Sequence, residues 1–496
     1  MLSNLLSSSV GVTALWISSA VLNACGTMAA GTPYTVYRGT FIQLPQLNAS
    51  TSKPQLARTQ GVLWVSSEDG RIKGYDWNVN DDASFQSFLS SQGWSESDVT
   101  VVKSNDERNE FFFPGFIDTH IHAPQYPNEG LFGSKGLLDW LNEYTFPMEA
   151  SFGSKSDPEN KQTDPKDTPP EGLRVYDEVV AKTLAHGTTC ASYFATIHVP
   201  ATNALAALCH KHGQRAFIGR VCMDNKDQCP SYYVDQSADE GFNATKRTID
   251  YINTLDPNGT LINPITHISE NNDEVALVQQ LFPESTSYAD VYDKAKLLTN
   301  RTILAHGVHL TKDEMKLISK RGSKVAHCPA SNSALGSGLA PVRYMLDQGV
   351  TVGLGTDVAG GYSPSILEVA RQASLVSRLV QYSSEYQALT GNKTFDGSEK
   401  LLVDEVVDMS DDIGGFDKGM IWDAQLIELG SVKNSSTSPL DVATLAGRAV
   451  ETGPVSNVDI FGNETWQEQV QKWMWDGDDR NVKNVWVQGK LVHTRD

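Results

Sequence analysis

The two ends of the chain share an alternation of hydrophobic and polar positions that predicts short β-strands. Residues 35–110 are typical of strands and turns, and Asp69-Gly70 lies between two apolar runs as a hairpin turn. Near the C-terminus, residues 423–429 and 484–494 have the same character. We therefore expect β-structure at both ends of the chain.

Between these regions, apolar runs of strand length alternate with amphipathic helical patterns, which indicates a parallel sheet with crossover helices. No eighth strand fits between Arg220 and His267, where the pattern leaves room only for a helix near Ala244–Leu255. Because a closed (β/α)₈ barrel needs eight strands, the expected α/β barrel is one strand short. The seven candidate barrel strands are residues 111–122, 188–197, 215–223, 262–270, 302–310, 324–331 and 351–358.

Local signals refine the regions around these strands. Ser363 and Pro364 are typical of the N-cap and first position of a helix that follows the last strand. Residues 153–172 are polar and rich in proline, which predicts a loop or insertion. Residues 1–27 are apolar, as in a secretory or membrane-targeting segment, but they lack the positively charged start of such a segment. The alternative is that Met28 is the start of the protein and that residues 1–27 are upstream sequence.

Composition narrows the classes of partner. The chain has 496 residues, 40% of them hydrophobic, and a formal net charge of -20. That charge argues against nucleic acid, whose binding needs a lysine and arginine footprint, and favours a neutral or cationic small molecule. The six cysteines form no CxxC pair, which favours reduced thiols in a cytoplasmic protein. The apolar run from Val10 to Cys25 is short for a membrane span, so we expect no membrane partner.

The candidate chemistry begins with His120 and His122, which lie on one face of the first barrel strand at its C-terminal end. Two imidazoles placed in this way can bind one divalent ion. The chain also carries a control, because His210 and His212 have the same spacing within a helical pattern closed by Gly213, where their rings diverge. We interpret that second pair as a solvated helix end.

Three later strands end in residues that complete a metal site. His267 with Glu270, then His306, then Asp357 each lie near the C-terminal end of a strand, where barrel enzymes build their active sites. Taken singly, the histidines are more often core residues, Asp357 a turn or cap, and Glu270 a helix-start carboxylate. Together, three imidazoles and a carboxylate are what zinc or ferrous iron requires.

Such a site predicts hydrolysis at an electrophilic carbon of an amide, a lactam or an amino-substituted heterocycle. A metal held by three or four protein ligands lowers the pKa of a bound water, so that hydroxide is the nucleophile. Asp357 and Glu270 are placed to accept and deliver protons, and His306 to orient the water. No GxSxG elbow, Walker-type loop or GxGxxG after a strand offers another mechanism.

These residues give the chain a resemblance to the amidohydrolase superfamily, and within it to the guanine deaminase family. The resemblance covers residues 111–493, and the HxHxPQ and TDVAGGYS segments are its most specific parts. It is carried by PGFIDTHIHAPQYP, YTFPMEASF, HGTTCASYFATIH, GQRAFIGRVCMD, THISENNDEV, LAHGVHL, VAHCPASN, GLGTDVAGGYS and GDDRNVKNVWVQGKLV.

The resemblance implies a zinc-bearing TIM barrel with a small β-sandwich formed from both termini, in a cytoplasmic homodimer that converts guanine and water to xanthine and ammonia. We therefore divide the chain into an apolar extension (1–27), the first part of the β-sandwich (28–110), the barrel (111–400) and a C-terminal segment that completes the β-sandwich (401–496). Carried over by position, the metal ligands are His120, His122, His267 and Asp357.

The same resemblance assigns the remaining roles. Glu270 shuttles protons to the purine, His306 lies beside the metal-bound water, and Asp357 accepts the proton of the hydroxyl. Gln125 hydrogen-bonds the base, with His122 and His267 also beside it.

Two departures from the family pattern keep other functions open. The family carries a Pro-Arg-Phe segment that contacts the purine before the HISE strand, whereas here residues 263–265 run straight into that strand. A helix before the C-terminal β segment is also absent. We therefore expect lower stability and weaker guanine selectivity, and we retain as alternatives a deaminase of a pterin or triazine and a non-catalytic or defective variant.

Overall fold

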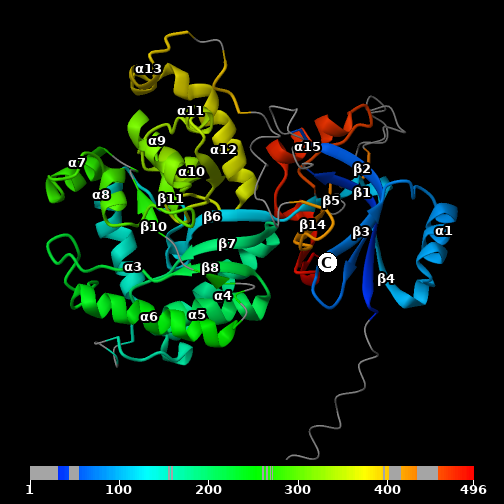
Figure 1. Cartoon of the computed structure of the whole chain (residues 1–496), viewed down its shortest axis with the longest axis horizontal. Coiled ribbons are helices and arrows are strands. Elements are labelled where there is room, and N and C mark those ends of the chain that lie inside the picture. Colours follow the sequence, from blue (N-terminus) through cyan, green and yellow to red (C-terminus); the bar gives the residue numbers. More distant parts are fainter. Residues whose placement is uncertain are drawn as a thin grey trace, which may run out of the picture.

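A computed structural model shows a mixed α/β protein in which a sheet built from both ends of the chain lies beside two parallel sheets (Figure 1). Residues 1–27 lie outside the part of the chain that the structure describes. The described residues are 32–43, 55–154, 157, 160–257, 259, 262–263, 266–268, 270, 272–394, 397–401, 415–432 and 456–495, with the backbone alone for 262–263 and 266–268. No helix in these ranges is both long enough and apolar enough to cross a bilayer.

The terminal sheet has eight strands, as the alternating patterns at both ends predict. Strands from the two ends meet where β5 pairs antiparallel with β14. Its members are β1 (Tyr34–Gln43), β2 (Ala57–Ser66), β3 (Ile72–Asp76), β4 (Val99–Lys103), β5 (Glu110–Pro114), β14 (Ala424–Glu428), β15 (Val482–Val487) and β16 (Lys490–Thr494). The predicted Asp69-Gly70 turn is confirmed, with Gly70 in the left-handed region at φ 68° between β2 and β3.

One helix interrupts the segment that we expected to contain only strands and turns. Helix α1 (Asp82–Gln92) begins at a capping box, in which the Asp81 carboxylate accepts from the backbone N–H of Ser84. Its Phe85, Phe88 and Leu89 are buried against the sheet. The helix therefore covers one face of β1 and β2.

The first parallel sheet contains four strands in the order β6-β7-β8-β9. They are β6 (Phe116–His122), β7 (Thr188–Phe194), β8 (Arg215–Gly219) and β9 (Ile262–Asn263). The expected single strand 111–122 is wrong, because the chain breaks at Pro114-Gly115 and gives β5 to the terminal sheet and β6 to the parallel one. Gly115 bonds the Asp423 carbonyl there, and a Cβ at Gly115 would lie 2.2 Å from Thr189.

The second parallel sheet has the order β10-β11-β12-β13. It consists of β10 (Thr266–Ile268), β11 (Ile303–His306), β12 (Lys324–His327) and β13 (Thr351–Leu354). The predicted strand 262–270 is thus divided, since its first part pairs with β8 and its second with β11. One segment serves two sheets, which accounts for the strand deficit in the sequence.

Amphipathic helices cover the parallel sheets as the pattern predicts (Figure 1). Helix α6 begins earlier than expected, and α12 begins at Ile366 with Ser365 as its N-cap, so the predicted Ser363 cap is wrong by two residues. The longer helices are α4 (Pro170–Ala185), α5 (Val199–His212), α6 (Ala238–Leu255), α7 (Asn272–Leu281), α9 (Lys312–Arg321), α12 (Ile366–Leu379) and α15 (Trp466–Asp476). The shorter helices are α2 (Leu137–Trp140), α3 (Phe146–Ala150), α8 (Tyr288–Lys294), α10 (Pro329–Ala334), α11 (Val342–Asp347) and α13 (Ser384–Thr390).

Hydrogen bonds join β6 to the chain that follows β13. The Thr119 hydroxyl donates to the Leu354 carbonyl at 2.7 Å, the Asp357 N–H to the His120 carbonyl at 2.8 Å, and the His122 N–H to the Val358 carbonyl at 3.0 Å. These bonds bring the C-terminal ends of the first and last parallel strands together.

Candidate active site

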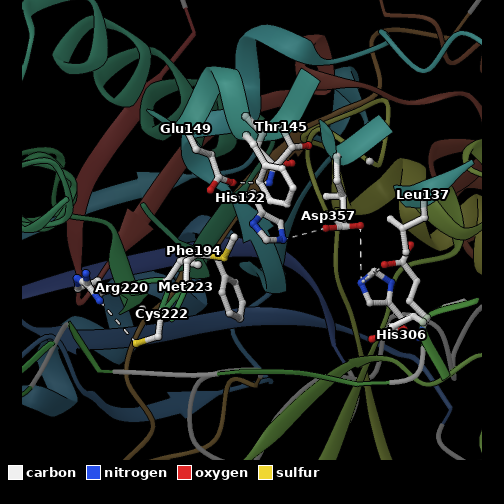
Figure 2. Close-up of a pocket in the computed structure, with 18 of the residues that line it drawn as sticks. His122, Leu137, Thr145, Glu149, Phe194, Arg220, Cys222, Met223, His306 and Asp357 are labelled. Atoms are coloured by element: carbon white, nitrogen blue, oxygen red, sulfur yellow. Dashed lines mark hydrogen bonds and ion pairs between the residues drawn. The ribbon is translucent and has the colours of Figure 1, made fainter. Parts of the chain in front are cut away.

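The end of β6 and the loop after β13 form a cluster of metal-ligating side chains. His120 Nε2 lies 3.1 Å and His122 Nε2 3.4 Å from Asp357 Oδ1. One donor atom from each of the three residues lies within 4.8 Å of the others. His122 and Asp357 point toward one another in Figure 2. The predicted pairing of the HxH strand with the carboxylate is therefore present.

The charge states of these groups suit metal binding. Burial lowers the pKa of both His120 and His122, the latter to about 3, so both imidazoles are neutral at pH 7 and keep a lone pair for a metal. Burial alone would raise the pKa of Asp357, but the neighbouring His120, His306 and His122 hold it well below its usual range. The neutral imidazoles of His120 and His122 and the ionised carboxylate of Asp357 thus surround one candidate metal position.

Asp118 holds the loop of Asp357 against β6. Its carboxylate accepts from the His120 N–H at 3.1 Å, and from the Thr356 N–H at 3.0 Å and hydroxyl at 2.5 Å. Asp357 itself has φ 49°, a left-handed conformation that is uncommon for a residue other than glycine. Sequence reasoning missed Asp118, although it lies on the same strand face as His120 and His122.

His267 lies at the expected strand end. Its backbone in β10 pairs with Ala305 of β11, so it lies one position before the level of His306 in the neighbouring strand. Its side chain is outside the described residues. Its ligand role stays a prediction.

Glu270 and His306 form a second pair beside the cluster. Glu270 Oε2 lies 3.4 Å from His306 Nε2, which is 3.9 Å from Asp357 Oδ2. Burial raises the pKa of Glu270 to about 7. Burial would lower the pKa of His306, but Glu270 and Asp357 raise it above its usual value, and the Asn332 side chain bonds its other ring nitrogen at 3.1 Å. A carboxyl that titrates near neutrality is suited to proton transfer.

Gln125 faces the same cavity from the turn after β6. Its amide N–H donates to Glu149 Oε1 at 2.7 Å, and its carbonyl oxygen accepts from the Ala359 N–H at 3.4 Å. The Tyr233 hydroxyl donates to the other oxygen of Glu149 at 2.5 Å. Glu149 lies in the family-like segment YTFPMEASF, but the sequence assigns it no role, and Tyr233 carries no sequence signal. Only the fold brings the two residues to Gln125.

One cavity of about 700 Å³, a size typical of small-molecule sites, is lined by His122, Asp357, Glu270, His306, Gln125 and Glu149. Figure 2 shows apolar and polar walls around it, with Leu137 and Phe194 on different sides and Arg220, Cys222 and Met223 at one end. The cavity also reaches Leu297, Arg301 and Thr302, just before β11. A flat heterocycle fits this mixture of apolar walls and a few polar groups.

The control pair of histidines behaves as predicted. His210 and His212 end helix α5, Gly213 caps it at φ 75°, and His212 bonds the Asp177 carboxylate at 2.8 Å on the surface. A further histidine, His327, is buried at the end of β12, and its pKa is lowered to about 3 by burial and then by His306. His309 instead bonds Glu385 at 2.6 Å.

Known proteins are similar to this chain in sequence. The profile of the Amidohydrolase family matches residues 111–492. A probable guanine deaminase of Schizosaccharomyces pombe is 42% identical over 77% of this chain and 71% of its own length. The guanine deaminase of Mus musculus is 35% identical over 94% of this chain and 98% of its own length.

Solved structures show the same similarity. The C. acetobutylicum guanine deaminase with bound guanine aligns at a TM-score of 0.67 and 26% identity, over 93% of this chain and 100% of that one. At the level of fold, atrazine chlorohydrolase from Arthrobacter aurescens, complexed with zinc, aligns at a TM-score of 0.65 and 17% identity, over 92% of this chain and 94% of that one.

Proposed function

Because the chain belongs to the amidohydrolase family, we propose that it is a metal-dependent deaminase that hydrolyses guanine to xanthine and ammonia. One observation carries this proposal: His122 and Asp357, which cluster with His120, line the same cavity as Glu270, His306 and Gln125. One small molecule in this cavity would therefore be within reach of the metal ligands, of the groups that transfer protons, and of the Gln125 amide that hydrogen-bonds the base.

The donor set fits a divalent ion. We infer zinc, because two imidazoles and a carboxylate that leave room for a further ligand form a common zinc coordination, and His267 would supply that ligand from β10. Ferrous iron uses similar donors. Bound there, the ion would act as a Lewis acid that lowers the pKa of a water molecule.

The protein's own groups would move the protons. Glu270, which carries a proton near neutral pH, would give that proton to the ring nitrogen beside the attacked carbon. Asp357, held ionised, would accept one proton of the attacking water and pass it to the leaving amine. Glu270 would recover its proton from the remaining hydroxyl as that oxygen becomes the carbonyl. His306, fixed by Asn332, orients the water between them. The carbon that bears the exocyclic amine gains a bond to oxygen and loses its bond to nitrogen, which leaves as ammonia.

We also infer that the two parallel sheets form the (β/α)₈ barrel typical of this family, over residues 111–400. The bonds between β6 and the loop after β13 support closure on one side. On the other side, β9 pairs with β8 and β10 pairs with β11, so that two short strands stand where the sequence predicts one. Residues 28–110 and 401–496 would then contribute the terminal β domain.

The family resemblance further leads us to propose a cytoplasmic homodimer. Sedimentation equilibrium of the purified chain tests the oligomeric state, and a monomer at micromolar concentration would contradict the proposal.

A second substrate class is favoured by one observation. The cavity continues past the metal cluster to Leu297, Arg301 and Thr302, which precede β11. A pterin, larger than guanine but carrying the same amino-substituted ring, is therefore the alternative. Parallel kcat/KM measurements with guanine and pterin decide between the two.

The proposal is tested by xanthine formation from guanine, with metal content determined on the same sample. We expect about one zinc per chain and activity in the wild type, and the loss of both in His122→Ala. The matched control is His212→Ala in the second HxH pair, which should retain metal and activity. Metal-replete protein without xanthine formation would contradict the proposal.

A further inference from the structure

Glu149 is a buried carboxylate that the metal chemistry does not use. It lies on helix α3, is 3% exposed, and lines the cavity on the same side as His122 (Figure 2). One of its oxygens accepts from Gln125 and the other from Tyr233. A buried carboxylate is costly unless its hydrogen bonds are satisfied, so these two contacts define what it does.

The hydrogen bonds through Glu149 run in one direction. The Ile197 N–H donates to the Tyr233 oxygen at 3.2 Å, so the proton of that hydroxyl is left for Glu149. At the other end, the Ala359 N–H donates to the Gln125 carbonyl oxygen. Two backbone N–H groups thus fix both ends of the chain of bonds.

A glutamine amide has two orientations in which its oxygen and nitrogen exchange places, and its neighbours decide between them. An ionised carboxylate only accepts, so Glu149 selects the orientation that turns the amide nitrogen of Gln125 toward it. Ala359 favours the same orientation, but its contact of 3.4 Å is long. The contact of 2.7 Å with Glu149 is charge-assisted and therefore carries most of the preference.

We propose that Glu149 is a positioning residue that fixes the Gln125 amide, so that its second N–H and its remaining lone pair present one set pattern to the heterocycle. This inference rests on the proposed function, in which Gln125 contacts the base. A site that reads hydrogen-bonding groups in this way rejects ligands with the wrong pattern far more strongly than an apolar pocket does.

The decisive variant is Glu149→Gln, which keeps the shape of the side chain. The Tyr233 proton still needs an acceptor and would take the oxygen of the new carboxamide, whose NH₂ group would then face Gln125. The Gln125 amide would have to turn over and direct its own NH₂ group at the Ala359 N–H. We expect KM for guanine to rise roughly tenfold or more, with a smaller change in kcat and unchanged metal content.

A second substitution separates positioning from a general structural role. In Glu149→Gln/Tyr233→Phe, no hydroxyl demands the carboxamide oxygen, so that oxygen can turn to Gln125 and restore its orientation. We expect the double variant to recover most of the lost affinity, and Tyr233→Phe alone to bind guanine nearly as well as the wild type. If Glu149 served only to hold the fold, the losses of guanine affinity in Glu149→Gln and in Tyr233→Phe would add in the double variant. That result would overturn the proposal.

The wild type, the two single variants and the double variant are compared at pH 8. Glu149 is ionised at this pH because burial raises its pKa only to about 7. Guanine turnover gives KM and kcat, and titration with xanthine, which does not react, gives Kd for the same four proteins. Rescue in the xanthine Kd without any turnover would support the positioning role and refute the proposed deaminase function. A wild type that does not bind xanthine would refute both.

Discussion

Asp235 is expected to stabilise the fold strongly because its partner is an arginine removed from water. The Arg220 side chain is 0% exposed and that of Asp235 4%. The guanidinium also donates to the Ile197 carbonyl at 2.8 Å, and Asp235 accepts from the Met223 N–H at 3.0 Å. Asp235→Asn leaves the buried cation without a counter-charge, so we expect the free energy of unfolding to fall by about 3–5 kcal/mol.

The chain offers a matched control on its surface. Arg321 donates two hydrogen bonds to Asp293, at 2.6 and 2.8 Å, but these side chains are 44% and 22% exposed. Asp293→Asn should therefore cost only about 0.2–1 kcal/mol.

Urea unfolding of the two variants and the wild type, followed by tryptophan fluorescence, measures both changes. Equal losses in the two variants would refute the reasoning, because burial is the main feature that separates the pairs.

Three further predictions concern the site. Glu270→Gln should lower kcat for guanine by about 10²–10⁴-fold while metal analysis finds wild-type content, and near-normal turnover would rule out its role in proton transfer. Dialysis against a chelator should abolish xanthine formation, and added zinc should restore it; activity that persists in metal-free protein would exclude the metal-dependent mechanism. Burial raises the pKa of Glu149 from 4.5 to about 7, so the folded state holds this proton more tightly than the unfolded state. Its contribution to stability is therefore greatest below pH 4.5 and is lost as the pH rises to about 7, so Glu149→Gln should show a shallower fall in unfolding free energy between pH 5 and 7; an unchanged slope would contradict this.

The parts of the site that could be predicted from sequence are those set by local geometry. Alternation along a strand places His120 and His122 on one face, and the helical period separates His210 from His212. Asp357 could be placed because polar residues at the C-terminal ends of parallel strands gather at one edge of the sheet.

The remaining parts depend on contacts between distant segments. Glu149 and Tyr233 are 84 positions apart in the chain, so no local pattern links them. The division of residues 262–268 between two sheets depends on which neighbour each half meets. Two features that we did not predict were nevertheless visible in the sequence. Pro114-Gly115 marks the break between β5 and β6, and Asp81 with Ser84 forms the capping box at the start of α1.

The antiparallel pairing of β5 with β14 has a consequence for the chain as it leaves the ribosome. Three successive phenylalanines, Phe111 to Phe113, lie on β5, whose partner begins at Ala424. Translation at about 5–20 residues per second needs roughly 15–60 s to make that partner. During this interval the nascent strand presents an apolar, unpaired edge of the kind that aggregates. Chaperone cover during synthesis is therefore expected to determine the yield, and fragments that end before residue 424 should be insoluble.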